Sequence, residues 1–128
     1  MQDRPVYVIL GEKVTSLESF FTVIGEVING PGGYFGSNLD AFADCLRGGM
    51  GTPPPPYLLY WRNSEKSRIA LGYPETVMQL KLRLMRCHPD NRKSIAADLA
   101  SAELGKGSTV FDELVAIIRE ENIELELA

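Results

Sequence analysis

The sequence predicts an α/β protein with a small three-stranded parallel sheet flanked by helices, and with an extra helical hairpin before the last helix and strand. Two short segments, 5–11 and 57–62, are continuously apolar, which is typical of buried strands, and a third, 123–127, alternates apolar and acidic residues. The connecting segments are long enough to cross over to a parallel neighbour and contain helical patterns. Strands that alternate with helices in this way indicate the α/β class.

The first two elements are predicted to be a strand and an amphipathic helix. The run PVYVILG, Pro5–Gly11, is apolar and ends at glycine, so we expect a strand that is central or well covered. In TSLESFFTVIGEVIN, Thr15 and Glu18 form a predicted capping box. The apolar residues that follow at helical spacing are Leu17, Phe20, Phe21, Ile24, Val27 and Ile28. The next residues, NGPGG, predict a turn that ends this helix.

The stretch GYFGSNLDAFADCLRGG predicts a second, short helix. Ser37 or Asn38 can cap it, and Asp40 and Asp44 are four residues apart and therefore share one face. Apolar residues at helical spacing define another face: Leu39, Phe42 and Leu46. The proline-rich segment 48–56 predicts an extended connector to the strand YLLYWR, whose aromatic side chains we expect in the core.

The next segment predicts a helical hairpin that follows an irregular loop. Residues 63–72 are polar and show no periodicity. A helix is expected from Pro74, because proline is favoured in the first turn, and Pro89 is expected to stop it. A weaker helix over 92–104 completes the hairpin. Three basic residues lie towards the end of the first of these helices: Lys81, Arg83 and Arg86.

The chain is predicted to close with a capped helix and a half-exposed strand. Thr109 and Asp112 have the spacing of a capping box, and apolar residues follow at helical spacing. The alternation in IELEL, residues 123–127, predicts a strand with one wet face. The length of 128 residues suits one domain over 1–128.

Composition and charge favour a cationic partner for this domain. The chain is 45% hydrophobic and 23% charged, with a net charge of −4. Residues 62–107 carry +4 and the remainder −8, which favours a cationic partner over nucleic acid. Neither an apolar run of about 18 residues nor a secretory signal is present, so we expect a cytoplasmic protein without membrane contact. Cys45 and Cys87 lack the paired spacing of a zinc site and are expected to be reduced thiols.

The sequence contains little that would support catalysis or the binding of a cofactor. The single histidine, His88, precedes Pro89 at a predicted helix end, where a surface role is favoured over a catalytic one. No Ser-His-Asp set can be assembled without it. The glycine clusters GPGG and GGMG match neither a phosphate-binding loop nor a dinucleotide fingerprint. We therefore expect a protein that is not an enzyme and needs no cofactor.

The residues themselves leave three interpretations of Asp40 and Asp44 open. In the first, Asp40 completes a capping box with Ser37, and Asp44 is an ordinary exposed acid. In the second, the two carboxylates bind magnesium, although no third carboxylate lies nearby. In the third, the two acids enter a cationic cleft on another protein, together with Tyr34 ahead of them and Ala43 beside them.

The run YFGSNLDAFADCL, residues 34–46, resembles the barstar family of ribonuclease inhibitors. The hallmark of that family is an aromatic pair, glycine, any residue, Asn-Leu-Asp-Ala, two variable positions and Asp-Cys-Leu. The first strand and helix, the strand YLLYWR and the closing helix and strand are similar to the family as well. The resemblance covers residues 5–66 and 108–127. It implies that a segment at about 68–107 is an insertion typical of a longer subfamily.

The resemblance implies a cytoplasmic inhibitor that covers the active site of a basic, secreted microbial ribonuclease and protects the producing cell. Asp40 corresponds to the aspartate that enters the phosphate site of the ribonuclease, and Asp44 to an acid that pairs with neighbouring basic groups. Tyr34 corresponds to an aromatic residue that packs against the catalytic histidine. Asn38 and Gly48 correspond to flanking contacts.

The sequence also departs from the family at the expected contact surface. Ala43 and Gly49 stand where the founding inhibitor has tryptophans, and Val115 or Ala116 stands where it has a contacting glutamate. These differences keep two other functions open. One is an immunity protein against a different toxin. The other is a nucleic-acid or regulatory module that uses the basic residues of the inserted helices, Lys81, Arg83 and Arg86.

Overall fold

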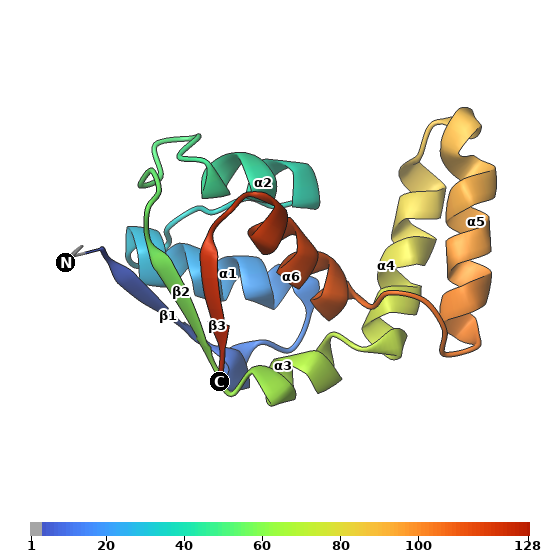
Figure 1. Ribbon diagram of the computed structural model, residues 1–128. Coiled ribbons are helices and arrows are strands. Elements are labelled where there is room, and N and C mark those ends of the chain that lie inside the picture. The colour runs from blue at the N-terminus through green and yellow to red at the C-terminus, as the bar shows by residue number, and fades with distance from the viewer. Residues whose placement is uncertain (1–3) are drawn as a thin grey trace.

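The structure, a computed structural model that describes residues 4–128, confirms the α/β class and the three-stranded parallel sheet (Figure 1). In chain order, the elements are β1 (Val6–Leu10), the 3₁₀ helix η1 (Gly11–Lys13), α1 (Leu17–Asn29), α2 (Leu39–Leu46), β2 (Leu58–Arg62), α3 (Ser64–Ala70), α4 (Tyr73–Arg86), α5 (Pro89–Glu103), α6 (Val110–Glu120) and β3 (Glu124–Leu127).

The strand β2 lies between β1 and β3, and both of its neighbours run parallel to it. The register aligns Ile9, Trp61 and Leu127 on the face that packs against the core, and α1 lies behind this face in Figure 1. On the other face Val6 is 54% exposed. The expectation of a central or well-covered first strand is therefore wrong. An apolar run does not by itself distinguish a central strand from an edge strand that is packed on one side only.

Aromatic side chains from α1, α2, β2 and α6 form the centre of the core. The rings of Phe20 and Trp61 are 5.1 Å apart between centroids, and Trp61 and Phe111 are 5.0 Å apart. Phe42 of α2 lies 5.5 Å from Phe20. These buried rings attach the short helix α2 to the sheet and to the two long helices beside it. The expected core position of Trp61 is confirmed, because its side chain is fully buried.

The N-terminus of α1 is capped by other residues than expected. The Ser16 hydroxyl accepts a hydrogen bond from the Ser19 amide at 3.1 Å, and the Ser19 hydroxyl accepts one from the Ser16 amide at 2.9 Å. The predicted box of Thr15 and Glu18 is therefore wrong by one residue. A serine at each position of the box competes well with the more familiar threonine and glutamate pair, since both hydroxyls can accept and donate.

The segment 63–72 contains the helix α3, which the sequence did not predict. Asn63 adopts a left-handed conformation with φ of 53° and turns the chain from β2 into this helix. The buried Ser67 hydroxyl donates to the Gly11 carbonyl oxygen and accepts from Trp61 Nε1, both at 2.9 Å. The inward-facing side chains of α3 are thus polar, so its sequence lacks the apolar periodicity that predicts an amphipathic helix.

The helices α4 and α5 form the expected hairpin, which stands beside the rest of the molecule in Figure 1. The predicted start of the second helix at residue 92 is wrong, because α5 begins at Pro89. His88 caps this helix: its Nδ1 atom accepts from the Asp90 amide at 3.1 Å. Proline suits the first turn of a helix as well as the position after one, so Pro89 marks a start here.

The closing elements agree with the sequence. Thr109 and Asp112 form the predicted capping box at α6. In β3 the side chains of Glu124 and Glu126 are exposed, and Leu125 and Leu127 pack against the core. Within residues 4–128, none of the helices is both long and apolar enough to cross a membrane.

Candidate functional site

The short helix α2 begins at a cap formed by Asn38. The Asn38 Oδ1 atom accepts a hydrogen bond from the Ala41 amide at 2.8 Å, and the Asn38 backbone is extended, as an N-cap residue requires. Ser37 therefore does not cap the helix, and Asp40 is its second residue rather than its third. The interpretation in which Asp40 completes a capping box is wrong, because its carboxylate makes no such contact.

The buried and exposed residues of α2 lie on opposite faces. Phe42, Cys45 and Leu46 are fully buried and fix the helix to the core. On the opposite side, four residues recur at the spacing i, i+3, i+4 and i+7, which places them on one face. This α2 outer face consists of Asp40, Ala43, Asp44 and Arg47.

The two aspartates on the α2 outer face differ in their surroundings. Asp40 is exposed, and its carboxylate forms neither a hydrogen bond nor an ion pair with any residue from 4 to 128. It lies in the first turn of α2. Asp40 is therefore a charged group that is free to bind a partner.

Asp44 is already paired inside the molecule. Its carboxylate forms an ion pair with Arg47, and Arg47 Nη1 also binds Glu121 Oε2 at 2.8 Å. The Glu121 carboxylate, followed by that of Asp44, raises the pKa of the Arg47 guanidinium above its usual value. The spacing of Asp44 and Arg47, at i and i+3 on a helix, indicates that these two residues can pair. Nothing in the sequence indicates the contact with Glu121, which lies 74 residues from Arg47 along the chain.

The loop before α2 presents Tyr34 at the surface. Phe35 is buried and packs edge-on against Phe42, with 5.9 Å between the ring centroids. The Asn29 side chain donates to the Tyr34 carbonyl oxygen at 2.8 Å. The Tyr34 side chain itself is 46% exposed. The chain on both sides of Tyr34 is thus held in place while its ring is available for contact.

The loop after α2 is tightly turned and holds the end of the helix. Gly48 has φ of +96°, a conformation that favours glycine. The Gly49 amide donates to the Asp44 carbonyl oxygen at 2.9 Å, and a Cβ atom added at Gly49 would lie 2.8 Å from the same oxygen. The Tyr57 hydroxyl donates to the Leu46 carbonyl oxygen at 2.9 Å. The path of the backbone therefore requires the absence of a side chain at Gly49.

The candidate residues lie on α2 and on the two loops that flank it. Asn38, Asp40, Ala43 and Asp44 belong to α2 and its cap, and the loops that flank the helix carry Tyr34 and Gly48. The final helix contributes an acid that the sequence did not indicate, Glu121 at the end of α6, which reaches the site through Arg47.

Other chemistry has less support in the described part of the chain. Residues 4–128 contain no cluster of three or more histidine, cysteine, aspartate or glutamate side chains that could hold a metal ion. Cys45 and Cys87 are free thiols, and burial raises the pKa of the Cys45 thiol. The exposed His88 caps α5 and belongs to the hairpin rather than to α2.

A comparison with protein-family models finds a match to the family described as barstar (barnase inhibitor) over residues 4–86. The match covers more than half of the 128 residues and includes all of α2. The chain belongs to the barstar family. A search of curated proteins found nothing that matches the chain. The match to the barstar family runs through α4 and ends before α5, so the insertion expected at about 68–107 stays a prediction.

Proposed function

We propose that this protein inhibits a basic, secreted microbial ribonuclease by covering its cationic active site with the α2 outer face. Membership in a family of barnase inhibitors supports this function. The observation that carries the mechanism is Asp40, an exposed carboxylate on a well-anchored helix that no group of the described chain neutralises. Such a carboxylate can replace a substrate phosphate in a pocket built from cationic side chains.

The other residues of the site have supporting roles in this proposal. Asp44 binds basic groups at the edge of the pocket, and Tyr34 packs against an aromatic or imidazole ring of the enzyme. Asn38 and Gly48 contact the enzyme at the two ends of the helix. Ala43 brings the backbone close to the enzyme surface without filling the space of a large side chain. The protein would act in the cytoplasm of the cell that makes the ribonuclease.

The substitution Asp40→Asn tests this mechanism. It removes the charge and keeps the size of the side chain, so inhibition should weaken by at least about tenfold, or about 1.4 kcal/mol of binding free energy. The measurement is the inhibition constant against barnase and a panel of other secreted microbial ribonucleases. The free energy of unfolding should fall by less than about 1 kcal/mol, because the Asp40 side chain forms neither a hydrogen bond nor an ion pair with residues 4–128.

Glu26→Gln provides the matched control. Glu26 is an exposed acid on α1, and it lies outside the proposed contact surface, so its removal changes the net charge by the same amount. Equal inhibition by wild type and Asp40→Asn would refute the role of Asp40. An absence of inhibition by the wild-type protein across the panel would refute the ribonuclease target and favour a different toxin.

The nucleic-acid alternative fits the structure less well. Arg83 forms an ion pair with Glu113, with 3.3 Å between Nη1 and Oε2. The Glu113 carboxylate offsets the positive charge that Arg83 would offer to a phosphate backbone. Lys81 and Arg86 are five residues apart and point roughly 140° apart around the α4 axis. The three basic residues of α4 therefore form no single stripe along which a nucleic acid could lie.

A further inference from the structure

A cleft of about 560 Å³ lies between α4 and the N-terminal end of α2. One face of α4 lines it, with residues at the helical spacing i, i+3, i+4 and i+7. Ser37, Asn38 and Leu39 line it from the side of α2. The residues that α4 contributes are Gln79, Leu82, Arg83 and Arg86. Because Asn38 belongs to this cleft and also caps α2, the cleft is continuous with the proposed ribonuclease-binding surface.

The wall of the cleft is fixed to the body of the protein by buried polar contacts. The Glu75 carboxylate accepts from the Leu17 amide at the start of α1 at 2.8 Å. The Thr76 hydroxyl accepts from the Val110 amide at the start of α6 at 2.9 Å. The base of α4 therefore satisfies amide groups at the first turns of two other helices. Such contacts hold α4 at a defined position relative to α2.

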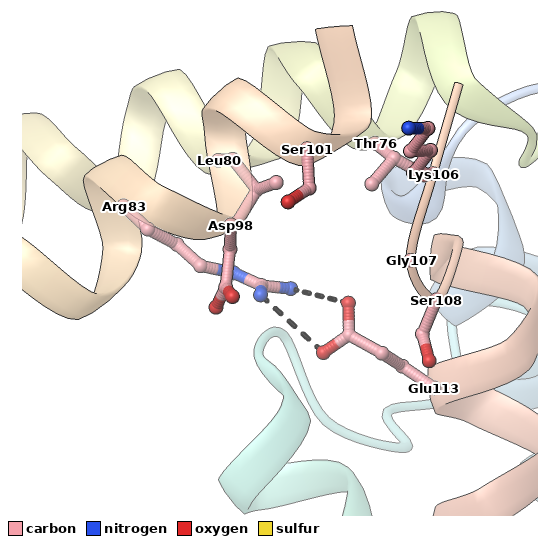
Figure 2. Close-up of a pocket in the computed structure, with 9 residues that line it drawn as sticks. All are labelled: Thr76, Leu80, Arg83, Asp98, Ser101, Lys106, Gly107, Ser108 and Glu113. Atoms are coloured by element: carbon pink, nitrogen blue, oxygen red, sulfur yellow. Dashed lines mark hydrogen bonds and ion pairs between the residues drawn. The ribbon is translucent and has the colours of Figure 1, made fainter. Parts of the chain in front are cut away.

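A further contact joins α4 to α6 about two turns beyond these anchors. Figure 2 shows Arg83 of α4 extending towards Glu113 of α6, and the two guanidinium nitrogens lie 3.3 and 3.4 Å from the two carboxylate oxygens. The outer part of α4 beyond Arg83 is consequently held beside α2 as one wall of a preformed cleft.

The cleft combines an apolar floor with hydrogen-bond donors that are not used inside the protein. Leu39, Leu82 and Ile95 are partly exposed and supply apolar surface. Arg86 is exposed and forms no ion pair or side-chain hydrogen bond with residues 4–128. The acid at the cleft, Glu18, accepts from Gln79 Nε2 at 3.0 Å. The unsatisfied polar group on the α4 wall is thus a cation.

We propose that this cleft receives a loop of the partner ribonuclease that carries an apolar side chain next to a carboxylate. The apolar side chain packs on Leu39 and Leu82, and the carboxylate binds Arg86. This inference rests on the proposed function, because it extends the contact surface of α2 to a second site on the same enzyme. The whole surface then pairs Asp40 with a cationic pocket and Arg86 with an acidic group beside it.

In this proposal the cleft also adds contact area that the α2 outer face lacks. Ala43 offers only a methyl group, and the backbone at Gly49 leaves no space for a side chain. Neither position 43, in the middle of the surface, nor position 49, at its C-terminal end, therefore supplies a large side chain for contact. The hairpin adds apolar and charged contact surface at the opposite, N-terminal end of α2.

Two pairs of variants test the cleft. Arg86→Glu reverses the charge in the cleft, and Lys81→Glu makes the same change on another side of α4, outside the cleft. Leu82→Gln removes apolar surface from the floor, and Met85→Gln makes a similar change at a side chain that is 81% exposed outside the cleft. Each variant, over residues 1–128, is assayed by calorimetry against whichever ribonuclease of the panel the wild type inhibits. Circular dichroism confirms that each variant is folded.

We expect Arg86→Glu and Leu82→Gln to bind about tenfold more weakly, and the two control variants to bind within about twofold of the wild type. If both cleft variants bind as tightly as the wild type while Asp40→Asn binds weakly, the proposed role of the cleft is wrong and the proposed function still stands. If the wild type inhibits none of the ribonucleases, the proposed function and the proposed role of the cleft are both wrong.

The two basic residues also separate a specific contact from a general effect of charge. Equal weakening by Lys81→Glu and Arg86→Glu would overturn the proposal, since it would show that only the net charge matters. Fluorescence anisotropy with a labelled single-stranded RNA supplies the other test. RNA binding by the wild type that both substitutions abolish would assign the basic residues of the hairpin to nucleic acid instead.

Discussion

The side chain of Arg47 lies between two carboxylates, those of Asp44 and Glu121, on the surface that we assign to the ribonuclease. A guanidinium in this position neutralises part of the acidic charge before any partner arrives. Asp40 has no such neighbour among the described residues. The three acids of the surface are therefore unequal: Asp44 and Glu121 share Arg47, whereas Asp40 has no cationic partner among residues 4–128.

Replacement of Arg47 by alanine should release Asp44 and Glu121 for a basic partner. We expect association with the ribonuclease to become severalfold faster at low salt, because electrostatic steering increases with the acidic charge of the surface. Stability should fall by less than about 1 kcal/mol, since the ion pairs are partly exposed. Stopped-flow mixing and urea denaturation measure these two quantities. Slower association would show instead that Arg47 itself contacts the enzyme.

At the scale of elements, α2 depends on its cap and on its buried face. The helix has eight residues, which is too short for stability in isolation, so tertiary packing and end contacts must hold it. Phe42 and Leu46 supply the packing, and Asn38 satisfies an amide of the first turn. The outer face can then vary in sequence without loss of the helix.

Asn38→Ala should lower the free energy of unfolding by about 1 kcal/mol, because the Ala41 amide loses its acceptor. Ser37→Ala is the matched control and should change the stability by less than about half of that amount, since the Ser37 hydroxyl does not cap the helix. Denaturation in urea, followed by tryptophan fluorescence, gives both values. An equal loss in both variants would contradict the assignment of the cap.

At the scale of the whole molecule, α4 links elements that are far apart in the sequence. Its first turns bind the starts of α1 and α6 through Glu75 and Thr76. The hairpin is thus joined to the core by contacts at the base of α4, and we propose that the chain folds as a single domain over 1–128. The same contacts place the distal part of α4 beside α2.

Thr76→Val tests this link. Valine has nearly the same shape as threonine but lacks the hydroxyl, so the buried Val110 amide loses its acceptor. We expect a loss of about 1–3 kcal/mol in the free energy of unfolding. Hydrogen exchange should show faster exchange at the Val110 amide and in α4. Unchanged protection of both would contradict a structural role for this contact.

Local patterns in the sequence were sufficient for most of the fold. The apolar spacing of α1 and α6, the proline at the start of α4 and the alternation in β3 each reflect a rule that acts within a few residues. Errors arose where two local solutions were similar in energy, as for Thr15 against Ser16 at the start of α1. The helix α3 was missed because its inward-facing residue Ser67 is polar and is satisfied by hydrogen bonds to Trp61 and to Gly11, which lies 56 residues away along the chain.

The sequence by itself determined the fold class, the position of α2 and the presence of two acids on its exposed side, because periodicity and family motifs are local properties of the chain. Only the tertiary structure decided which acids are free. Arg47 and Glu121 meet because α6 ends beside α2, and Arg86 lines a cleft because α4 is anchored at α1 and α6. Contacts of this kind depend on the packing of distant elements, which no local pattern encodes.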